Sequence, residues 1–286
     1  MVLVAPTAPS SLPGFPSVQA RQWVDGRADD DVAWQDRGLL FGDGVFETMR
    51  VQDAGLPLWS WHRDRLLQAI DRLRLDVSMA HIEDHLAGHL AQLDSGVLRL
   101  TLTRGQGGAY RPLPDSTVRL ISHWRPLPPA VEEVRATLLQ QRLGHQPMLA
   151  GLKHLNRLEQ VILQAELDGH PGCDEALVQD IAGRVIEGVA SNVFMVHRYV
   201  LHTPIIDECG VAGVMRAWVL ERCRKVRIPT RICALDVSDF LAADEVFFCN
   251  AVRGIMPVHD LLGRSMGTGV ITSKLQMELT QVLRHV

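Results

Sequence analysis

The hydrophobic residues in the first half of the chain show two periodicities, one typical of strands and one typical of helices. Residues 96–105, GVLRLTLTRG, alternate apolar and polar side chains, as in a half-buried strand, and residues 45–51, VFETMRV, are also typical of a strand. Between them, Leu66, Ile70 and Leu73 recur at helical spacing. A turn that contains a glycine at position 55 favours a hairpin. The pattern therefore predicts strands at 45–51, 56–59, 96–105 and 117–124, and helices at 61–75 and about 79–93.

The second half begins after a proline-rich connector, RPLPPAVEE, at 125–133. Its apolar runs are mostly short and are separated by turn residues such as Gly183, which favours strands. We expect strands at 134–141, 175–180, 184–190, 192–197 and 199–204, a buried strand opening into a loop within 243–258, and helices at 154–167 and within 207–225. This order of elements indicates an α+β fold. We divide the chain into a flexible arm at 1–20, a smaller domain at 21–125 and a larger domain at 126–286.

Composition narrows the class of protein. The 286 residues are 47% hydrophobic and 22% charged, with a formal net charge of −4, which is typical of a globular protein and gives no basic field for nucleic acid or an anionic membrane. The five cysteines form no CxxC pair, so we expect free thiols and no metal site. No signal peptide or long apolar span is evident, so we expect a cytoplasmic protein.

Lys153, in the stretch LAGLKHLNRLEQ, is the first candidate for chemistry. The helix expected after it buries an apolar stripe of Leu155, Leu158, Ile162 and Ala165. Lys153 lies off this stripe, so periodicity alone favours a solvated side chain. The alternative is a Schiff-base lysine, whose amine must be neutral near pH 7. Burial or a nearby cation can achieve this, and His154 and Arg157 are close in sequence.

Three further residues are ambiguous when each is considered alone. Glu187 lies in an otherwise apolar run, where a carboxylate either faces solvent or meets a positive group such as a pyridinium nitrogen. Gly213 is either a simple turn glycine or the start of a helix whose first N–H groups bind an anion. Arg50 is either a surface arginine on a hairpin or a ligand for phosphate.

Several catalytic signatures are missing from the sequence. It contains no GxSxG elbow, no Walker motif, no HExxH and no GxGxxG after a strand. His81, His85 and His89 recur every four residues on the second expected helix. No carboxylate-rich segment accompanies them, so we expect a polar helix face rather than a metal site.

Taken in order, five segments resemble the fold-type IV pyridoxal-phosphate enzymes, a group that includes branched-chain and D-amino-acid aminotransferases and aminodeoxychorismate lyases. The segments are DRGLLFGDGVFETMRV, GLKHLNRLEQVIL, VIEGVASNVFMV, TPIIDECGVAGVMR and ADEVFFCNAV. The resemblance implies a smaller N-terminal α/β sandwich and a larger domain with a barrel-like sheet that binds pyridoxal 5'-phosphate. It also implies a homodimer with the site near the domain interface.

The same resemblance assigns roles by position. Lys153 resembles the Schiff-base lysine, and Glu187 resembles the partner of the pyridine nitrogen. The implied phosphate contacts are Arg50, the backbone N–H groups around Val214 and Met215, and Asn250 with Ala251.

Within the group, the run KHLNRLEQ resembles the lyases more than the aminotransferases. The glycine-rich TRGQGG also resembles theirs, but this chain lacks an arginine directly after the glycines. Arg104 and Arg111 are therefore candidates to meet the substrate there, and His154 is a further one. The implied reaction converts 4-amino-4-deoxychorismate to 4-aminobenzoate and pyruvate. The alternatives are an aminotransferase on the same scaffold and a non-catalytic vitamin-binding module, which would have no use for Lys153 as a base.

Overall fold

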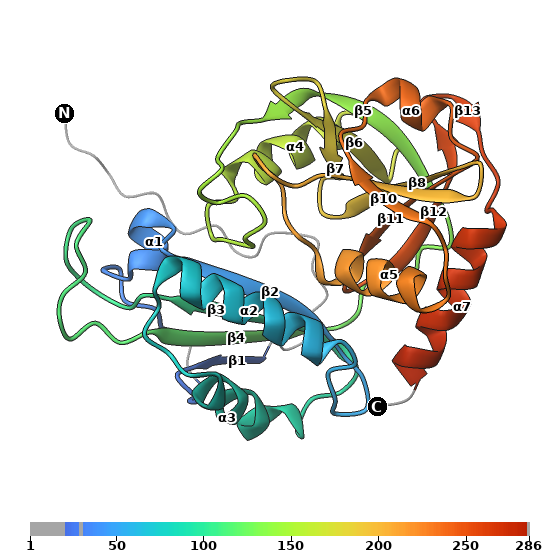
Figure 1. Cartoon of the computed structure of the whole chain (residues 1–286). Coiled ribbons are helices and arrows are strands. Elements are labelled where there is room, and N and C mark those ends of the chain that lie inside the picture. The colour runs from blue at the N-terminus through green and yellow to red at the C-terminus, as the bar shows by residue number, and fades with distance from the viewer. Residues whose placement is uncertain (1–20, 29–30, 285–286) are drawn as a thin grey trace, which may run out of the picture.

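The computed structural model of the chain describes residues 21–28 and 31–284, which form two lobes (Figure 1). The expected arm at 1–20 lies outside the described residues. The strands are β1 (Arg21–Val24), β2 (Gly44–Val51), β3 (Gly96–Thr103), β4 (Arg119–Arg125), β5 (Val134–Leu143), β6 (Glu175–Asp180), β7 (Val185–Glu187), β8 (Asn192–His197), β9 (Val200–Pro204), β10 (Thr230–Cys233), β11 (Glu245–Asn250), β12 (Gly254–Leu261) and β13 (Arg264–Ser265). The helices are α1 (Arg37–Phe41), α2 (Trp59–Leu73), α3 (Met79–Leu90), α4 (Leu158–Asp168), α5 (Val214–Lys225), α6 (Val237–Leu241) and α7 (Val270–Arg284).

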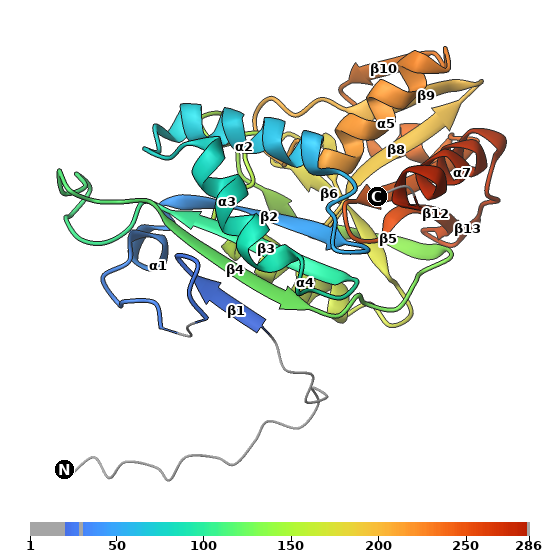
Figure 2. The same cartoon turned by 90° about the horizontal axis from the view of Figure 1, so that it is seen from below.

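The smaller lobe is a four-stranded antiparallel sheet, in the order β1-β4-β3-β2, with α2 and α3 covering one face (Figure 2). The period-two pattern of the strands directs Met49, Leu98 and Leu100 into the core beneath these helices. Leu66 of α2 and Ile82 of α3 pack into the same core. The two helices expected in this half are therefore confirmed, because an apolar face of each closes the core.

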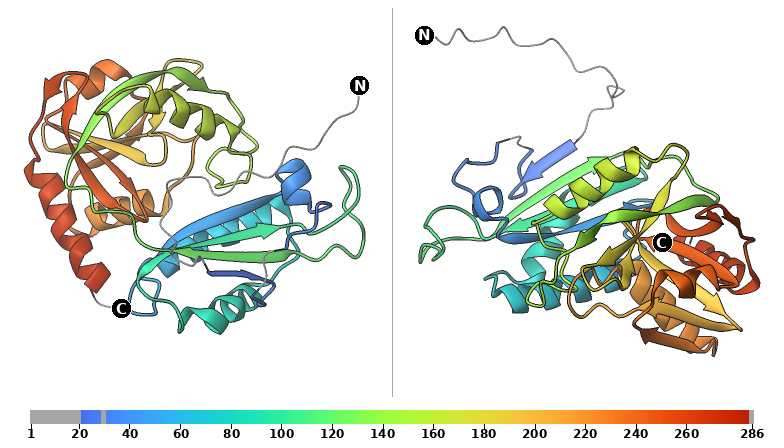
Figure 3. Two further views of the ribbon diagram at one scale, coloured as in Figure 1. Left: turned by 180° about the vertical axis from the view of Figure 1, so that it is seen from behind. Right: turned by 90° about the horizontal axis from the view of Figure 1, so that it is seen from above.

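The larger lobe is a mixed nine-stranded sheet that curls on itself (Figure 3). Its path runs β10-β9-β8-β11-β12-β5-β6-β7, with β13 paired to β12. Apolar clusters cover both faces, so its strands are nearly continuous apolar runs. On one face, Trp218 of α5 and Leu275 of α7 pack around Phe194 and Phe247, whose rings stack with centroids 5.0 Å apart. Phe240 of α6 is buried in the cluster on the other face.

Two strand predictions are wrong. Residues 56–59 enter α2 instead of returning along β2, because Pro57 has no N–H group to donate to a strand ladder. Gln52 and Gly55 still close the predicted turn through an isolated bridge. Within 243–258, the single strand and loop are replaced by two antiparallel strands, β11 and β12.

The apolar stripe predicted for the helix at 154–167 is also wrong. The helix begins only at Leu158, whose side chain is 70% exposed, and Ile162 is 46% exposed. Leu163 and Leu167 form the buried face instead. The reason is that the residues before Leu158 pair with other segments as extended chain, which shifts the start and the orientation of α4.

The polar face predicted for α3 is wrong as well. His85 and His89 are buried beneath the helix. The Nε2 of His85 lies 2.8 Å from the hydroxyl of Ser122 in β4, and the ring of His89 stacks on Trp23 at 4.3 Å. The His85 ring thus serves as a flat core side chain with one polar contact, whereas the buried Nε2 of His89 has no hydrogen-bond partner.

The boundary proposed between the domains coincides with the connector of the two lobes. Arg125 ends β4 and Val134 begins β5. Within the described residues, no strand of the four-stranded sheet pairs with the nine-stranded one. We retain the division at 125/126 as a proposal. Separately, none of the helices in the described ranges is long and apolar enough to cross a membrane.

Candidate active site

The segment that carries Lys153 is held between the two lobes. The N–H group of Phe46, in β2, donates to the carbonyl of Lys153 over 2.9 Å. On the other side, the N–H group of Ala212, just before α5, donates to the carbonyl of Gly151 over 3.1 Å. The lysine is thus fixed by main-chain hydrogen bonds to both lobes, which places it at their interface.

The environment of the Lys153 amine favours its neutral form. The side chain is half-buried, and its Nζ lies 4.5 Å from the centroid of the Phe46 ring. Burial, aided by the positive charges of Arg65 and Arg157, lowers the pKa of Lys153 to about 8, although Glu47 opposes the shift. At pH 7 roughly a tenth of an amine with this pKa is neutral, far more than for an ordinary lysine, and a nucleophile or base requires this neutral form.

Glu187 ends β7 as a buried carboxylate. It accepts a hydrogen bond of 2.8 Å from the N–H group of Val211. Among the described residues it forms no ion pair. Burial therefore raises the pKa of Glu187 to about 7. Such a carboxylate is suited to a cationic ring nitrogen, which would restore its charge.

The start of α5 offers a site for an anion. Gly213 is the N-cap, and no side chain caps the helix. The side chains of Val214 and Met215 are buried in the core, which leaves their N–H groups at the uncapped end. A Cβ at Gly213 would lie 2.0 Å from the Oδ1 of Asn192, so only glycine fits here. This helix start was expected from the sequence, and it lies beside the Lys153 segment.

Arg65 of α2 supplies a cation at this helix start. Its Nη1 donates to the carbonyl of Ala212 over 3.1 Å, and its Nε donates to Glu47 over 2.7 Å. The N–H group of His62 completes the carboxylate's contacts at 2.6 Å. Burial alone would raise the pKa of Glu47, but Arg65 and His62 hold it at about 2. The guanidinium is thus locked beside the uncapped N–H groups, where a phosphate dianion would meet both.

Arg50, the arginine expected to bind phosphate, lies elsewhere. It is four residues beyond Phe46 on β2, a separation of about 13 Å along a strand. Its Nε is buried without a hydrogen-bond partner. The geometry therefore favours Arg65 over Arg50 for the phosphate role. Sequence reasoning missed Arg65 because its partner, Glu47, is distant in sequence.

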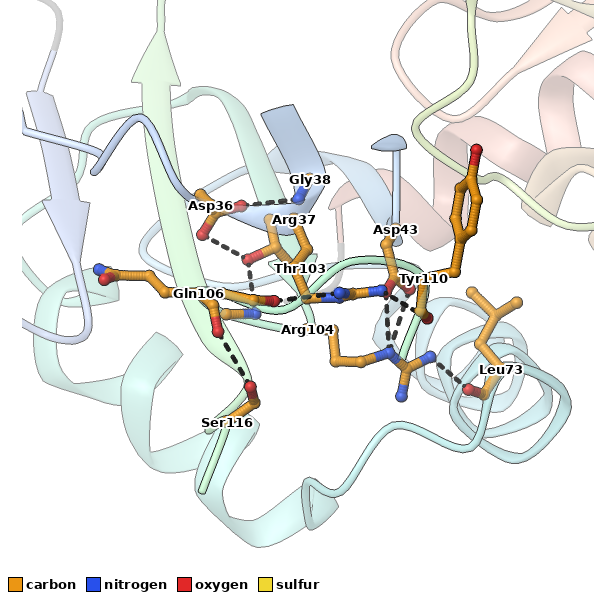
Figure 4. Close-up of polar contacts among 12 residues, drawn as sticks. Asp36, Arg37, Gly38, Asp43, Leu73, Thr103, Arg104, Gln106, Tyr110 and Ser116 are labelled. Carbon is orange, nitrogen blue, oxygen red and sulfur yellow. Dashed lines mark hydrogen bonds and ion pairs between the residues drawn. The ribbon is translucent and has the colours of Figure 1, made fainter. Parts of the chain in front are cut away.

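Arg104, expected to meet the substrate, is instead engaged in a structural network (Figure 4). Its Nε donates to Asp43 over 2.9 Å, and its terminal nitrogens donate to the carbonyls of Leu73 and Arg74 at the end of α2. The buried Arg37 shares Asp43 at 2.8 Å. This arrangement fixes the glycine-rich loop and occupies the Arg104 guanidinium, so we do not assign it to substrate.

His154 is also poorly suited to binding a carboxylate. Burial and the nearby charge of Arg157 lower the pKa of His154 to about 4, so its ring is neutral at pH 7. Arg99 of β3 is better placed, because its guanidinium lies 3.8 Å from the centroid of the Phe46 ring. Phe46 thus lies beside both the Arg99 cation and the Lys153 amine. Sequence reasoning did not single out Arg99, which looked like an ordinary polar position on an alternating strand.

Asn250 and Ala251 lie at the end of β11. The Oδ1 of Asn250 accepts from the N–H group of Arg253 over 2.8 Å and so shapes the turn that follows. Ala251 packs against the core beneath α5. β11 pairs with β8, whose Asn192 donates to the carbonyl of Val211. The expected second phosphate contact is therefore close to the helix start, and we keep it as a proposal.

Fold and site together define a class of enzyme. The family described as "Amino-transferase class IV" matches residues 44–261, and the chain belongs to this family. Its fold-type IV architecture, expected from the sequence, is confirmed.

Particular relatives add detail. The chain is 32% identical to an aminodeoxychorismate lyase of Vibrio harveyi over 248 residues, covering 84% of this chain and 90% of the relative. It is 40% identical to the crystal structure of 4-amino-4-deoxychorismate lyase from Pseudomonas aeruginosa, with a TM-score of 0.87, covering 91% of this chain and 98% of that one. A branched-chain aminotransferase structure from Thermoproteus uzoniensis is 26% identical, with a TM-score of 0.81. The match covers 92% of this chain and 95% of that one.

Enzymes of this family depend on pyridoxal phosphate, as expected for this chain. The described residues fit the cofactor. A half-buried amine suits its aldehyde, the unpaired carboxylate of Glu187 suits its ring nitrogen, and Arg65 with the uncapped start of α5 suits its phosphate.

Proposed function

We propose that this protein is a lyase that converts 4-amino-4-deoxychorismate to 4-aminobenzoate and pyruvate. The observation that carries the proposal is the Lys153 segment, KHLNRLEQ, which lies between the lobes with its amine in a cation-lined site. Similarity to the aminodeoxychorismate lyases of Vibrio harveyi and Pseudomonas aeruginosa over most of the chain supports it.

The residues of the site divide the chemical work. Pyridoxal phosphate, when bound, supplies the electron sink. Glu187 would keep the ring nitrogen protonated, and Arg65 with the N–H groups of Val214 and Met215 would hold the phosphate. Lys153, once its amine is free, removes the proton from the substrate carbon that bears the amino group. It then returns a proton to the departing oxygen, because its pKa of about 8 allows both steps near neutrality.

Arg99 is our candidate for binding a substrate carboxylate. Its guanidinium and the Lys153 amine contact the same ring of Phe46, so a substrate reacting at Lys153 lies within reach of Arg99. A planar guanidinium matches a carboxylate with two parallel hydrogen bonds. The proposed substrate carries two carboxylates, so such a cation is needed.

A homodimer also belongs to the proposal. Exposed apolar side chains gather on α1, on the loop after β3 and on α4, forming an α1–α4 patch of Leu39, Leu40, Tyr110, Leu158, Val161 and Ile162. The amide of Asn156, which precedes α4, donates over 3.2 Å to the carbonyl of Gly42, which follows α1. We propose that these exposed apolar side chains form a subunit interface, where such side chains are typical. A cytoplasmic location is consistent with the five free cysteines.

The test is a direct assay of 4-aminobenzoate release. Purified protein reconstituted with pyridoxal phosphate and supplied with 4-amino-4-deoxychorismate should release 4-aminobenzoate and pyruvate in equal amounts. Lys153→Ala should abolish release. Absence of product from the wild-type protein would refute the lyase assignment.

An aminotransferase is the second candidate, favoured by the similarity to the Thermoproteus uzoniensis enzyme. It would leave the cofactor as pyridoxamine phosphate after incubation with an amino donor alone, and would then need a keto acid. Analysis of the cofactor after such an incubation, with branched-chain and D-amino acids as donors, separates the two reactions. Rapid accumulation of pyridoxamine phosphate without 4-aminobenzoate activity would favour the aminotransferase.

A further inference from the structure

Arg157 donates hydrogen bonds to the main chain on both sides of Lys153. Its Nε donates to the carbonyl of His154 over 2.9 Å, and its Nη2 donates to the carbonyl of Leu152 over 3.3 Å. These carbonyls belong to the residues immediately before and after the lysine. The Leu152 carbonyl belongs to the peptide group before Lys153, and the His154 carbonyl belongs to the second peptide group after it. One half-buried side chain thus holds the chain on both sides of the lysine.

The same guanidinium brings positive charge to the site. No ion pair involves Arg157 among the described residues. The groups that act electrostatically on Lys153 from the surrounding elements are Arg65 of α2, Glu47 of β2, Glu187 of β7 and Arg157 itself. Arg65 is paired with Glu47, but its charge still acts on the amine and does so more strongly than that of Arg157. Arg157 therefore brings to the base of the lysine a positive charge that no ion pair engages among the described residues, although the carboxylates of Glu187 and Glu159 also act on it.

We propose that Arg157 is a positioning residue for Lys153, which holds the chain on both sides of the lysine through two carbonyls and places a positive charge near the amine. The inference rests on Lys153 acting as the base of the proposed reaction. It also gives a physical reason for the arginine in KHLNRLEQ. The lowered pKa of Lys153, to which Arg157 contributes after burial and Arg65, agrees with this role.

A matched control is available in Arg72 of α2. Its guanidinium donates to the carbonyls of Ala150, Pro147 and Met148 in the same loop. Arg72 is exposed and does not figure among the charges that act on Lys153. Arg72→Gln therefore removes carbonyl contacts from this loop without removing the charge at the amine.

The first measurement is the titration of the lysine amine in cofactor-free protein. The chain has only three lysines, Lys153, Lys225 and Lys274, so ¹³C-labelled lysine gives few NMR signals, and the Lys153 signal is assigned by its loss in Lys153→Met. We expect a midpoint near pH 8 in the wild-type protein. It should move upward in Arg157→Gln and stay in place in Arg157→Lys and in Arg72→Gln. An unchanged midpoint in Arg157→Gln, or an equal shift in Arg72→Gln, would overturn the inference.

The second measurement is turnover. Arg157→Lys retains the charge but not the fixed fork of donors, so kcat should fall by about tenfold with little change in KM. Arg72→Gln should retain wild-type kcat. A wild-type kcat in Arg157→Lys would contradict the positioning role of the two hydrogen bonds from Arg157. This comparison remains available if Arg157→Gln does not fold. The amine titration needs neither substrate nor cofactor, so a negative lyase assay with a shifted midpoint would refute the proposed reaction and not the role of Arg157.

Discussion

Glu187 shows that a residue suited to the chemistry of the site can lower the stability of the cofactor-free protein. Its carboxylate is buried with one backbone hydrogen bond, and its pKa is raised to about 7. The folded, cofactor-free chain holds this proton up to about pH 7, whereas the unfolded chain releases it near 4.5. The cofactor-free protein therefore loses stability as the pH rises from about 4.5 to 7 and beyond.

Glu187→Gln should accordingly stabilise the cofactor-free protein. At pH 8 the free energy of unfolding should rise by about 2 kcal/mol, and the gain should vanish near pH 4.5. Turnover should fall, because an amide does not keep the ring nitrogen protonated. Urea denaturation at both pH values and a turnover assay check this. An equal or lower stability of the variant at pH 8 would contradict the origin of the raised pKa.

The two arginines considered for the phosphate make opposite predictions. Arg65→Gln should weaken pyridoxal phosphate binding by about 10- to 100-fold, because it removes a charge-assisted contact. Arg50→Gln should leave the affinity nearly unchanged. Since Arg65→Gln also leaves Glu47 buried without its partner, the double variant Glu47→Gln/Arg65→Gln serves as the control for folding. Cofactor titration monitored by absorbance measures the affinity of all three variants. A larger loss of affinity in Arg50→Gln than in Arg65→Gln would restore Arg50 as the phosphate ligand.

At the residue scale, the sequence predicted the chemistry of the site better than its contacts. Lys153 and Glu187 were ambiguous when each was read alone, and their roles were expected only because the order of five segments resembles the fold-type IV enzymes. Arg65 escaped notice because it is meaningful only when α2 packs against β2 and brings it to Glu47. Arg104 was misassigned because a glycine-rich loop does not reveal that Asp43 already occupies its guanidinium.

At the scale of single elements, α3 shows how a core can hold titratable groups. His85 is buried, and burial together with His89 lowers its pKa to about 4. The unfolded chain binds the proton near pH 6.5 and the folded chain only near 4. The stability that this helix contributes is thus complete above pH 6.5 and is lost as the pH falls toward 4.

Acid should therefore loosen the smaller lobe first. Between pH 6.5 and pH 4 we expect His85 alone to remove about 2 kcal/mol of stability. His85→Asn should reduce this pH dependence, whereas His81→Asn, on the exposed side of the same helix, should not. Thermal unfolding across this pH range tests the prediction, and equal slopes for the two variants would contradict it.

Sequence patterns predicted most elements but not always their orientation. Helices α2, α3 and α5 and strands β2 to β6, β8 and β9 coincide with expected segments. The exposed and buried faces of α4 were reversed because periodicity assumes that the helix starts where the apolar run does. Here the residues after Lys153 are extended and bonded to β2, so the helix starts later.

At the scale of the whole molecule, the α1–α4 patch should mediate self-association. Val161→Asp places a charge on a side chain that is 62% exposed in the single chain, and it should convert a dimer into monomers. Met277→Asp, at a side chain 64% exposed on α7 outside the patch, is the matched control. Analytical ultracentrifugation distinguishes the species. A wild-type monomer, or a dimer unaffected by Val161→Asp, would refute this interface.

The connection between the lobes has a consequence for how the protein can be divided. The Lys153 segment belongs to the larger lobe but bonds to β2, while Leu58 of the smaller lobe is buried in the core beneath α5. The lobes are therefore held together by their own contacts and not by the connector alone. A gene cut within 126–133 should yield two fragments that reassemble and complement each other, with the reactive lysine contributed by one piece and the arginine for the phosphate by the other.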